Sequence, residues 1–169
     1  LGGPKGCAGA ARQAGFDGLI VPDAPLSEAG PLVAAAADCG LSFSLLIAPG
    51  TTLERAEAIV KACTGFVYLL LRGGITGEQA KVPDVSGRIS RLRQMTDLPI
   101  ACGFGISTPE HVRTVVRHAD AAIVGSALVN RMRAARESGG DPVGAAAAFT
   151  RELALGLRGE PAETESASS

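Results

Sequence analysis

Short apolar runs alternate with longer amphipathic stretches along most of the chain. Five apolar runs have the length and continuity that predict β-strands buried on both faces, at 18–23, 42–48, 65–71, 98–103 and 120–125. The stretches between them have helical composition, at 7–14, 27–39, 51–62, 84–95, from 107 onward, 126–136 and 141–157. The strands recur at intervals of roughly 22 to 33 residues, which is typical of repeated βα units. The pattern therefore predicts an α/β fold with a parallel sheet.

Two parallel-sheet architectures compete at this point. An open doubly wound sheet accommodates five strands, whereas a (β/α)8 barrel needs eight strands and about 250 residues; this chain has 169. No GxGxxG motif follows the first predicted strand, which disfavours a dinucleotide-binding fold. Residues 159–169 are rich in Glu, Ala and Ser without an apolar period, and we expect them to form a disordered tail.

Composition narrows the possible functions. Lys and Arg number 16 and Asp and Glu 17, for a formal charge of −1, so nothing favours a nucleic-acid or anionic-membrane partner. No apolar run approaches the roughly 20 residues that cross a bilayer, and no signal peptide begins the chain. The four cysteines form no CxxC pair, so we expect reduced core thiols in a cytoplasmic protein and no metal site. His111 and His118 are seven residues apart on one predicted helix, and we expect them on its outer surface.

Glycines follow three of the predicted strands directly. They stand at 74–77, at 103–107 and at 124–126, each where a strand ends and a helix follows. Glycine allows backbone N–H groups to approach an anion closely, and a helix N-terminus adds partial positive charge. In (β/α)8 barrels the loops after the last two strands frequently form a phosphate site. The glycine pattern therefore predicts phosphate binding at the carboxyl edge of the sheet.

A set of motifs in a fixed order resembles the tryptophan synthase alpha subunit family. The motifs are VPDAP at 21–25, YLLLR at 68–72, GITG at 74–77, TDLP at 96–99, GFGISTPE at 103–110 and VGSA at 124–127. The resemblance implies a TIM (β/α)8-barrel fold, present here from about its fourth strand as a partial barrel of about five βα units over residues 1–158. It also implies retro-aldol cleavage of indole-3-glycerol phosphate to indole and glyceraldehyde 3-phosphate, with no cofactor. The implied partner is a beta subunit that carries pyridoxal phosphate.

The resemblance also assigns roles to single residues. Backbone positions at Gly77, Gly105, Gly125 and Ser126 match those that bind the substrate phosphate. The side chains that match the lining of the substrate pocket are Ile20, Tyr68 and Phe104. Asp23 matches a residue that couples the two subunits, and Thr76 matches a loop residue that closes the site.

The family's two catalytic carboxylates come from its first two strands. They are a Glu that acts as general acid and base and an Asp that binds the indole N–H, and neither has a counterpart in this sequence. Two alternatives to the lyase therefore stay open. One is a non-catalytic module that binds a phosphorylated ligand or a beta subunit. The other is a related phosphate-binding barrel enzyme of the indole-glycerol-phosphate synthase or thiamine-phosphate synthase type. A piece of five strands would expose the edge of its first strand, and we expect either marginal stability or self-association through that edge.

Overall fold

The computed structural model of the chain describes residues 2–71, 85–103 and 105–158. Helices and strands alternate, as the sequence predicts. The strands are β1 (Gly18–Ile20), β2 (Ser42–Ser44), β3 (Leu46–Ile47), β4 (Val67–Leu70), β5 (Ile100–Gly103) and β6 (Ala121–Ile123). The α-helices are α1 (Gly3–Gln13), α2 (Ala29–Asp38), α3 (Leu53–Ala62), α4 (Ser86–Arg93), α5 (Pro109–Val116), α6 (Ser126–Glu137) and α7 (Pro142–Ala154), and the 3-10 turns are η1 (Leu26–Glu28) and η2 (Leu155–Leu157).

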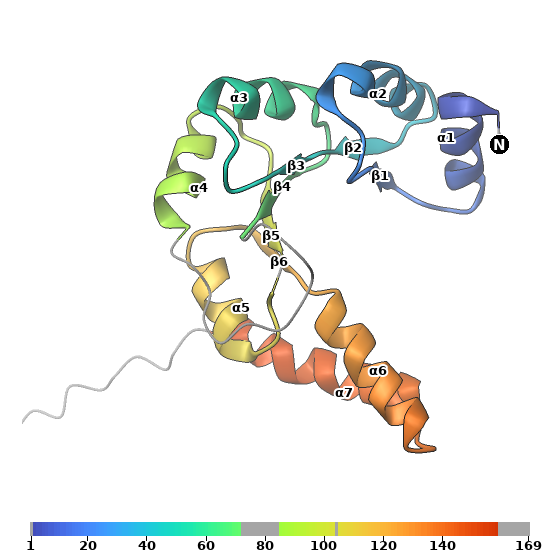
Figure 1. The fold of residues 1–169 in the computed structure, drawn as a ribbon, viewed down its shortest axis with the longest axis vertical. Coiled ribbons are helices and arrows are strands. Elements are labelled where there is room, and N and C mark those ends of the chain that lie inside the picture. Colours follow the sequence, from blue (N-terminus) through green and yellow to red (C-terminus); the bar gives the residue numbers. More distant parts are fainter. Residues whose placement is uncertain (1, 72–84, 104, 159–169) are drawn as a thin grey trace, which may run out of the picture.

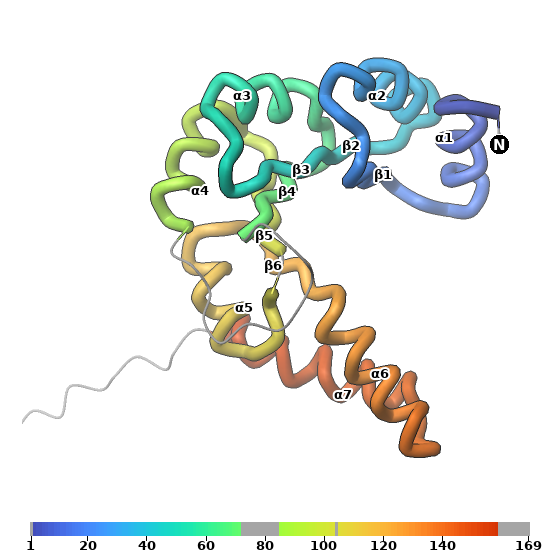
Figure 2. Tube along the Cα trace, viewed as in Figure 1, coloured from blue at the N-terminus to red at the C-terminus, as the bar shows by residue number. Residues whose placement is uncertain are grey.

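All described strand pairs are parallel, and they form two sheets. β1 pairs with β2, while β3, β4, β5 and β6 form a second sheet in chain order. The sheets curve into an open arc, with the strands on its inner side and α1 to α5 on its outer side (Figures 1 and 2). Helices α6 and α7 pack as a hairpin that extends from the end of the arc (Figure 1). The predicted α/β class and partial barrel are therefore confirmed.

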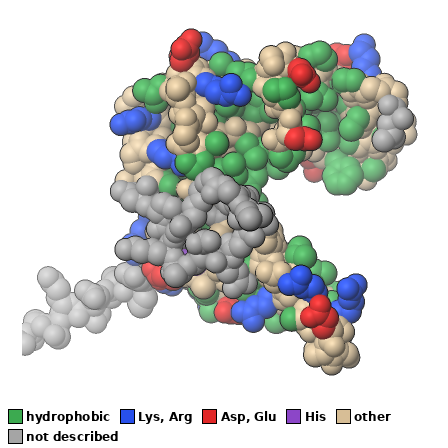
Figure 3. All heavy atoms as spheres, viewed as in Figure 1, with side chains coloured by type: hydrophobic (Ala, Val, Ile, Leu, Met, Phe, Trp, Pro, Cys, Tyr) green, Lys and Arg blue, Asp and Glu red, His purple; other side chains and the backbone are tan. Residues whose placement is uncertain are grey.

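The hydrophobic core lies between the sheets and the helices outside them. Phe43, Val67, Leu69 and Cys102 are completely buried. The inner side of the arc is more open, because Tyr68 is half-buried and Ile20 is 43% exposed. Hydrophobic side chains are visible along this inner side in the space-filling view (Figure 3). Burial alternates along β4, with the apolar packing on the helix side and the more accessible positions on the concave side, whereas every residue of β5 is buried.

The predicted strand at 42–48 is interrupted at Leu45, where the structure differs from the sequence prediction. The Leu45 N–H donates to Cys63 Sγ at 3.3 Å, and the Phe43 N–H donates to Thr64 Oγ1 at 2.9 Å. The Phe66 N–H in turn donates to Ser44 Oγ at 3.3 Å. These side-chain acceptors add to two backbone hydrogen bonds, from the Thr64 N–H to the Phe43 carbonyl and from the Tyr68 N–H to the Leu45 carbonyl. At this break the chain passes from the β1–β2 sheet to the β3–β6 sheet.

Side chains cap the starts of α3 and α7. Thr52 Oγ1 accepts a hydrogen bond from the Arg55 N–H, and Asp141 Oδ1 accepts one from the Val143 N–H. The first helix begins earlier than predicted, at Gly3, because Pro4 provides a favourable first turn. All four cysteines are free: Cys63 and Cys102 are buried, and Cys39 is partly buried against the core. Cys7 is exposed, so the expectation of a core thiol is wrong for this residue. The predicted tail at 159–169 lies outside the described residues.

Asp120, which precedes β6, is bonded to the start of β5 and to the end of α4. Its Oδ2 accepts from the Ile100 N–H at 2.7 Å and lies 2.8 Å from Arg93 Nη2. The Arg93 guanidinium, followed by the Ile100 N–H, holds the pKa of Asp120 below its usual value. A depressed carboxyl pKa stabilises the fold above the unfolded-state pKa of about 3.9, and this contribution is lost as the pH falls through the folded-state pKa.

Replacing Asp120 with asparagine should therefore lower the melting temperature at neutral pH but not in strong acid. The wild-type and D120N proteins are compared by thermal melts between pH 7 and pH 2, and the difference should narrow below about pH 4. The exposed Asp38, 3.9 Å from Lys5 Nζ, provides the control. D38N should change little at any pH, because exposed ion pairs contribute little. If the melting temperatures of D120N and the wild type differ by the same amount down to pH 2, the ionised Asp120 carboxylate does not stabilise the fold.

Candidate functional site

The loop after β5 has a backbone shape that requires glycine. Gly103 ends the strand on the concave side, where a Cβ atom would collide with the Tyr68 phenol. Gly105 has a φ of +85°, in the left-handed region that other residues rarely adopt. Ile106 follows and is buried, which anchors the loop in the core. The backbone at this strand end therefore favours glycine at both 103 and 105.

Gly125 and Ser126 lie at the start of α6, directly after β6. Gly125 is the N-cap, with φ −120° and ψ −81°, and no side chain caps the helix there. By contrast, Thr108 caps α5 by accepting from the His111 N–H at 3.2 Å. The first N–H groups of α6 are thus not bonded by a capping side chain, and an anion could accept from them. Because β5 and β6 are adjacent and parallel, Gly105 and Gly125 lie beyond the same edge of the sheet.

Tyr68 and Ile20 both lie on strands that line the arc. Tyr68 is in β4 beside Gly103, and Ile20 is the last residue of β1. Burial, followed by the nearby Cys102 thiol, raises the pKa of Tyr68, so the phenol is protonated at neutral pH and can donate a hydrogen bond. Burial also raises the pKa of Cys102 to about 11, which keeps that thiol unreactive. This part of the arc therefore offers apolar surface and one neutral polar group.

Asp23 follows β1 in an exposed turn. It lines a cavity of about 360 Å³ together with Pro22 and Pro25, and Arg55 of α3 lines the same cavity. No ion pair joins Asp23 to Arg55, and the Asp23 side chain is accessible from outside. The structure thus places this predicted partner-coupling residue on the surface, at the carboxyl end of its strand.

Three predicted site residues lie outside the described part of the chain. They are Thr76, Gly77 and Phe104. The described residues therefore bring together Gly105, Gly125 and Ser126 at one sheet edge, with Tyr68 and Ile20 along the arc.

His111 corrects one expectation from the sequence. It is only 7% exposed rather than on an outer helix surface, and its Nδ1 accepts from the Ser107 N–H at 3.3 Å. His118 is exposed, but it lies beyond Val116, the last residue of α5. The four-residue spacing of Ser107 and His111 across a helix start was the signal that could have found this contact.

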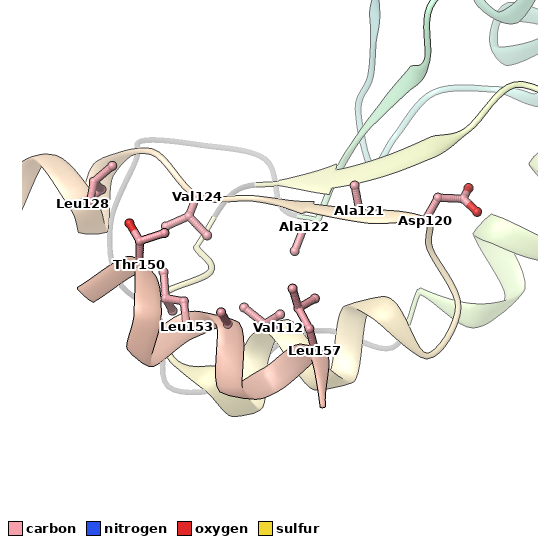
Figure 4. Close-up of a pocket in the computed structure, with 10 residues that line it drawn as sticks. Val112, Asp120, Ala121, Ala122, Val124, Leu128, Thr150, Leu153 and Leu157 are labelled. Carbon is pink, nitrogen blue, oxygen red and sulfur yellow. The ribbon is translucent and has the colours of Figure 1, made fainter. Parts of the chain in front are cut away.

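A larger cavity of about 440 Å³ borders the loop between β6 and α6, because Val124 is part of its lining (Figure 4). It is enclosed by β6, α5 and α7, and Val112, Leu153 and Leu157 point into it (Figure 4). The Asp120 carboxylate points away from its centre (Figure 4). An apolar lining of this kind suits the packing of further hydrophobic groups and does not suit a phosphate.

Neither a metal cluster nor a membrane span is present in the described residues. Across 2–71, 85–103 and 105–158, no three His, Cys, Asp or Glu side chains gather as metal ligands would. None of the described helices has the length and apolar character needed to traverse a bilayer.

Known proteins are similar to this chain in sequence. The family description "Tryptophan synthase alpha chain" matches residues 3–156. The alpha chain of Acaryochloris marina is 47% identical over 147 residues, which are 86% of this chain and 54% of that protein. The alpha chain of Thermosynechococcus vestitus is 50% identical over 125 residues, 73% of this chain and 47% of that protein. This chain therefore spans about half the length of the curated relatives it matches.

Solved structures lead to the same family. A Mycobacterium tuberculosis tryptophan synthase structure superposes with a TM-score of 0.80 at 33% identity, covering 94% of this chain and 58% of that one. The alpha subunit from Legionella pneumophila gives a TM-score of 0.79 at 31% identity, and the match covers 92% of this chain and 57% of that one. With the family match over residues 3–156 and these relatives, the chain belongs to the tryptophan synthase alpha chain family.

Proposed function

We propose that the protein to which these residues belong cleaves indole-3-glycerol phosphate to indole and glyceraldehyde 3-phosphate. The observation that carries this proposal is the position of Gly105 and of Gly125–Ser126 beyond neighbouring strands of one sheet. Backbone N–H groups there can bind the phosphate of the substrate without a metal ion. Family membership supplies the reaction, because the relatives are tryptophan synthase alpha chains.

In this proposal this chain supplies the part of the barrel that binds and orients the substrate. Gly77, Gly105, Gly125 and Ser126 hold the phosphate, while Ile20, Tyr68 and Phe104 line the indole side. A fixed phosphate supplies binding energy remote from the reacting bond and limits the motion of the glycerol chain. The proton transfers belong to the Glu and Asp that the family carries on its first two strands, where a shielded site adjusts their pKa values.

The proposed partner is a tryptophan synthase beta subunit, and the proposed location is the cytoplasm. A Pyrococcus furiosus structure with a TM-score of 0.75 and 28% identity is of an α2β2 tryptophan synthase complex. The exposed turn at Asp23 supports a role of this residue in coupling the two subunits, and Thr76 would close the loop over the site. The beta subunit carries pyridoxal phosphate, so no cofactor is assigned to this chain.

A chimera tests whether these residues perform the substrate-binding half of the reaction. Residues 3–156 replace the matching region of the Acaryochloris marina alpha chain, which supplies the early strands. We expect the chimera to release indole from indole-3-glycerol phosphate at a rate within about tenfold of the parent enzyme, because the phosphate-binding positions are retained. Indole release is followed directly, and glycerol 3-phosphate binding is measured by calorimetry on both the chimera and the 169-residue chain.

The two readouts separate the lyase from the binding module. A folded chimera that binds glycerol 3-phosphate but releases no indole would favour the non-catalytic alternative. A folded chimera that does neither would contradict the proposal. Circular dichroism and a cooperative thermal melt of the chimera establish that it is folded.

A further inference from the structure

The imidazole of His111 joins the start of α5 to the loop before it. Its Nδ1 accepts from the Ser107 N–H at 3.3 Å, and the Ser107 hydroxyl oxygen lies 3.5 Å from the same nitrogen. The His111 N–H donates to Thr108 Oγ1 at 3.2 Å. Side chains on a helix tilt toward its N-terminus, which is why a residue in the first turn can reach back to this loop. His111 is buried, and its bond to Ser107 is part-buried.

This contact differs in register from the usual capping box. In that motif the side chain three residues after the N-cap bonds the N–H of the N-cap itself. Thr108 is the N-cap of α5 and His111 stands at the third helical position, but its imidazole bonds the N–H of the preceding residue, Ser107. The imidazole therefore restrains the loop outside the helix and not the helix end alone.

The restrained loop is the one that carries Gly105. Gly105 adopts its left-handed conformation, Ile106 is anchored in the core, and Ser107 is held by His111. We propose that His111 is a positioning residue that fixes the Gly105–Ser107 backbone for binding a phosphate ester. The proposal rests on the proposed function of this edge. Backbone donors bind an anion well only when they are held within about 0.5 Å of the productive geometry. Without the His111 acceptor the Ser107 N–H must find another partner, and the loop then shifts away from that geometry.

Three variants of the 169-residue chain test this role. H111L removes the acceptor and keeps an apolar side chain, whereas H111Q keeps an oxygen that can accept from Ser107. T108A removes the helix cap but leaves the His111 to Ser107 bond, so it controls for general weakening of α5. Each protein is titrated with glycerol 3-phosphate, and hydrogen exchange of the Ser107 amide is measured by NMR.

We expect H111L to weaken binding by about tenfold or more and to speed exchange of the Ser107 amide. The affinity of H111Q should be within about twofold of the wild type. T108A should bind with the wild-type affinity. Both H111L and T108A should lower the melting temperature, so a loss of affinity in H111L alone cannot come from a weaker α5. If H111L binds as tightly as the wild type, or leaves Ser107 exchange unchanged, the positioning role is overturned. If the wild type itself binds no glycerol 3-phosphate, the phosphate-binding function is what fails, and Ser107 exchange still reports whether His111 holds the loop.

Discussion

Replacing Phe43 with alanine is expected to lower the free energy of unfolding by about 3–5 kcal/mol. Phe43 is completely buried in β2, beside Leu19 of β1, and is among the largest fully buried side chains of the described residues. Its removal leaves a cavity that the surrounding helices cannot fill without moving. Small domains have only about 5–15 kcal/mol of stability, so this loss is a large share of the total. Urea unfolding followed by circular dichroism measures it.

Phe16 provides the matched control for this change. It is 60% exposed, so F16A removes the same side chain from a position with little packing. We expect F16A to change the free energy of unfolding by less than about 1 kcal/mol. Equal losses for the two variants would show that the core does not lie between the sheets and their helices.

Replacing Gly105 with alanine is expected to weaken glycerol 3-phosphate binding by at least about tenfold, which is about 1.4 kcal/mol. An alanine at a φ of +85° is strained by roughly 1–2 kcal/mol, so the loop moves to a conformation that relieves the strain. Its N–H groups then no longer point at the phosphate. Calorimetric titration of the variant and the wild type measures the change in affinity.

Gly139 supplies a control with the same backbone strain. It lies between α6 and α7 with a φ of +74°, and a Cβ atom there would meet no other group. G139A should therefore cost a similar amount of stability and leave glycerol 3-phosphate binding unchanged. If both variants weaken binding equally, the effect of G105A comes from general destabilisation and the assignment of Gly105 is wrong.

The order of helices and strands could be predicted from the sequence because each signal is local. The runs at 65–71 and 98–103 are continuous apolar segments, as strands buried in a parallel sheet require. Thr52 and Asp141 stand at helix starts, where their side chains bond residues two or three positions later. The interruption at Leu45 could not be predicted, because its hydrogen-bond acceptor is the Cys63 side chain, 18 residues away.

In the candidate site, too, some features have a local sequence signal and others do not. Gly105 and Gly125 could be found because each glycine directly follows an apolar run. The burial of His111 could not be predicted from helical spacing, which pairs it with His118 on one face. That spacing assumes a helix that continues through both residues, whereas α5 ends at Val116. The family resemblance, and not the periodicity, assigned Ile20 and Tyr68 to the pocket.

The interruption between β2 and β3 changes how substitutions there act. In a regular ladder the peptide groups are the same for every residue type, so strand pairing tolerates many side chains. Here Ser44, Cys63 and Thr64 provide the acceptors for strand and loop N–H groups. The alignment of these segments therefore depends in part on side chains. A substitution at one of these three residues would remove a hydrogen bond to a backbone N–H group, whereas substitutions elsewhere in the sheet leave the backbone hydrogen bonds in place. Substitutions at Cys63 and Thr64 are therefore expected to disturb the backbone of β2 and of the segment leading into β3, although neither residue belongs to a strand.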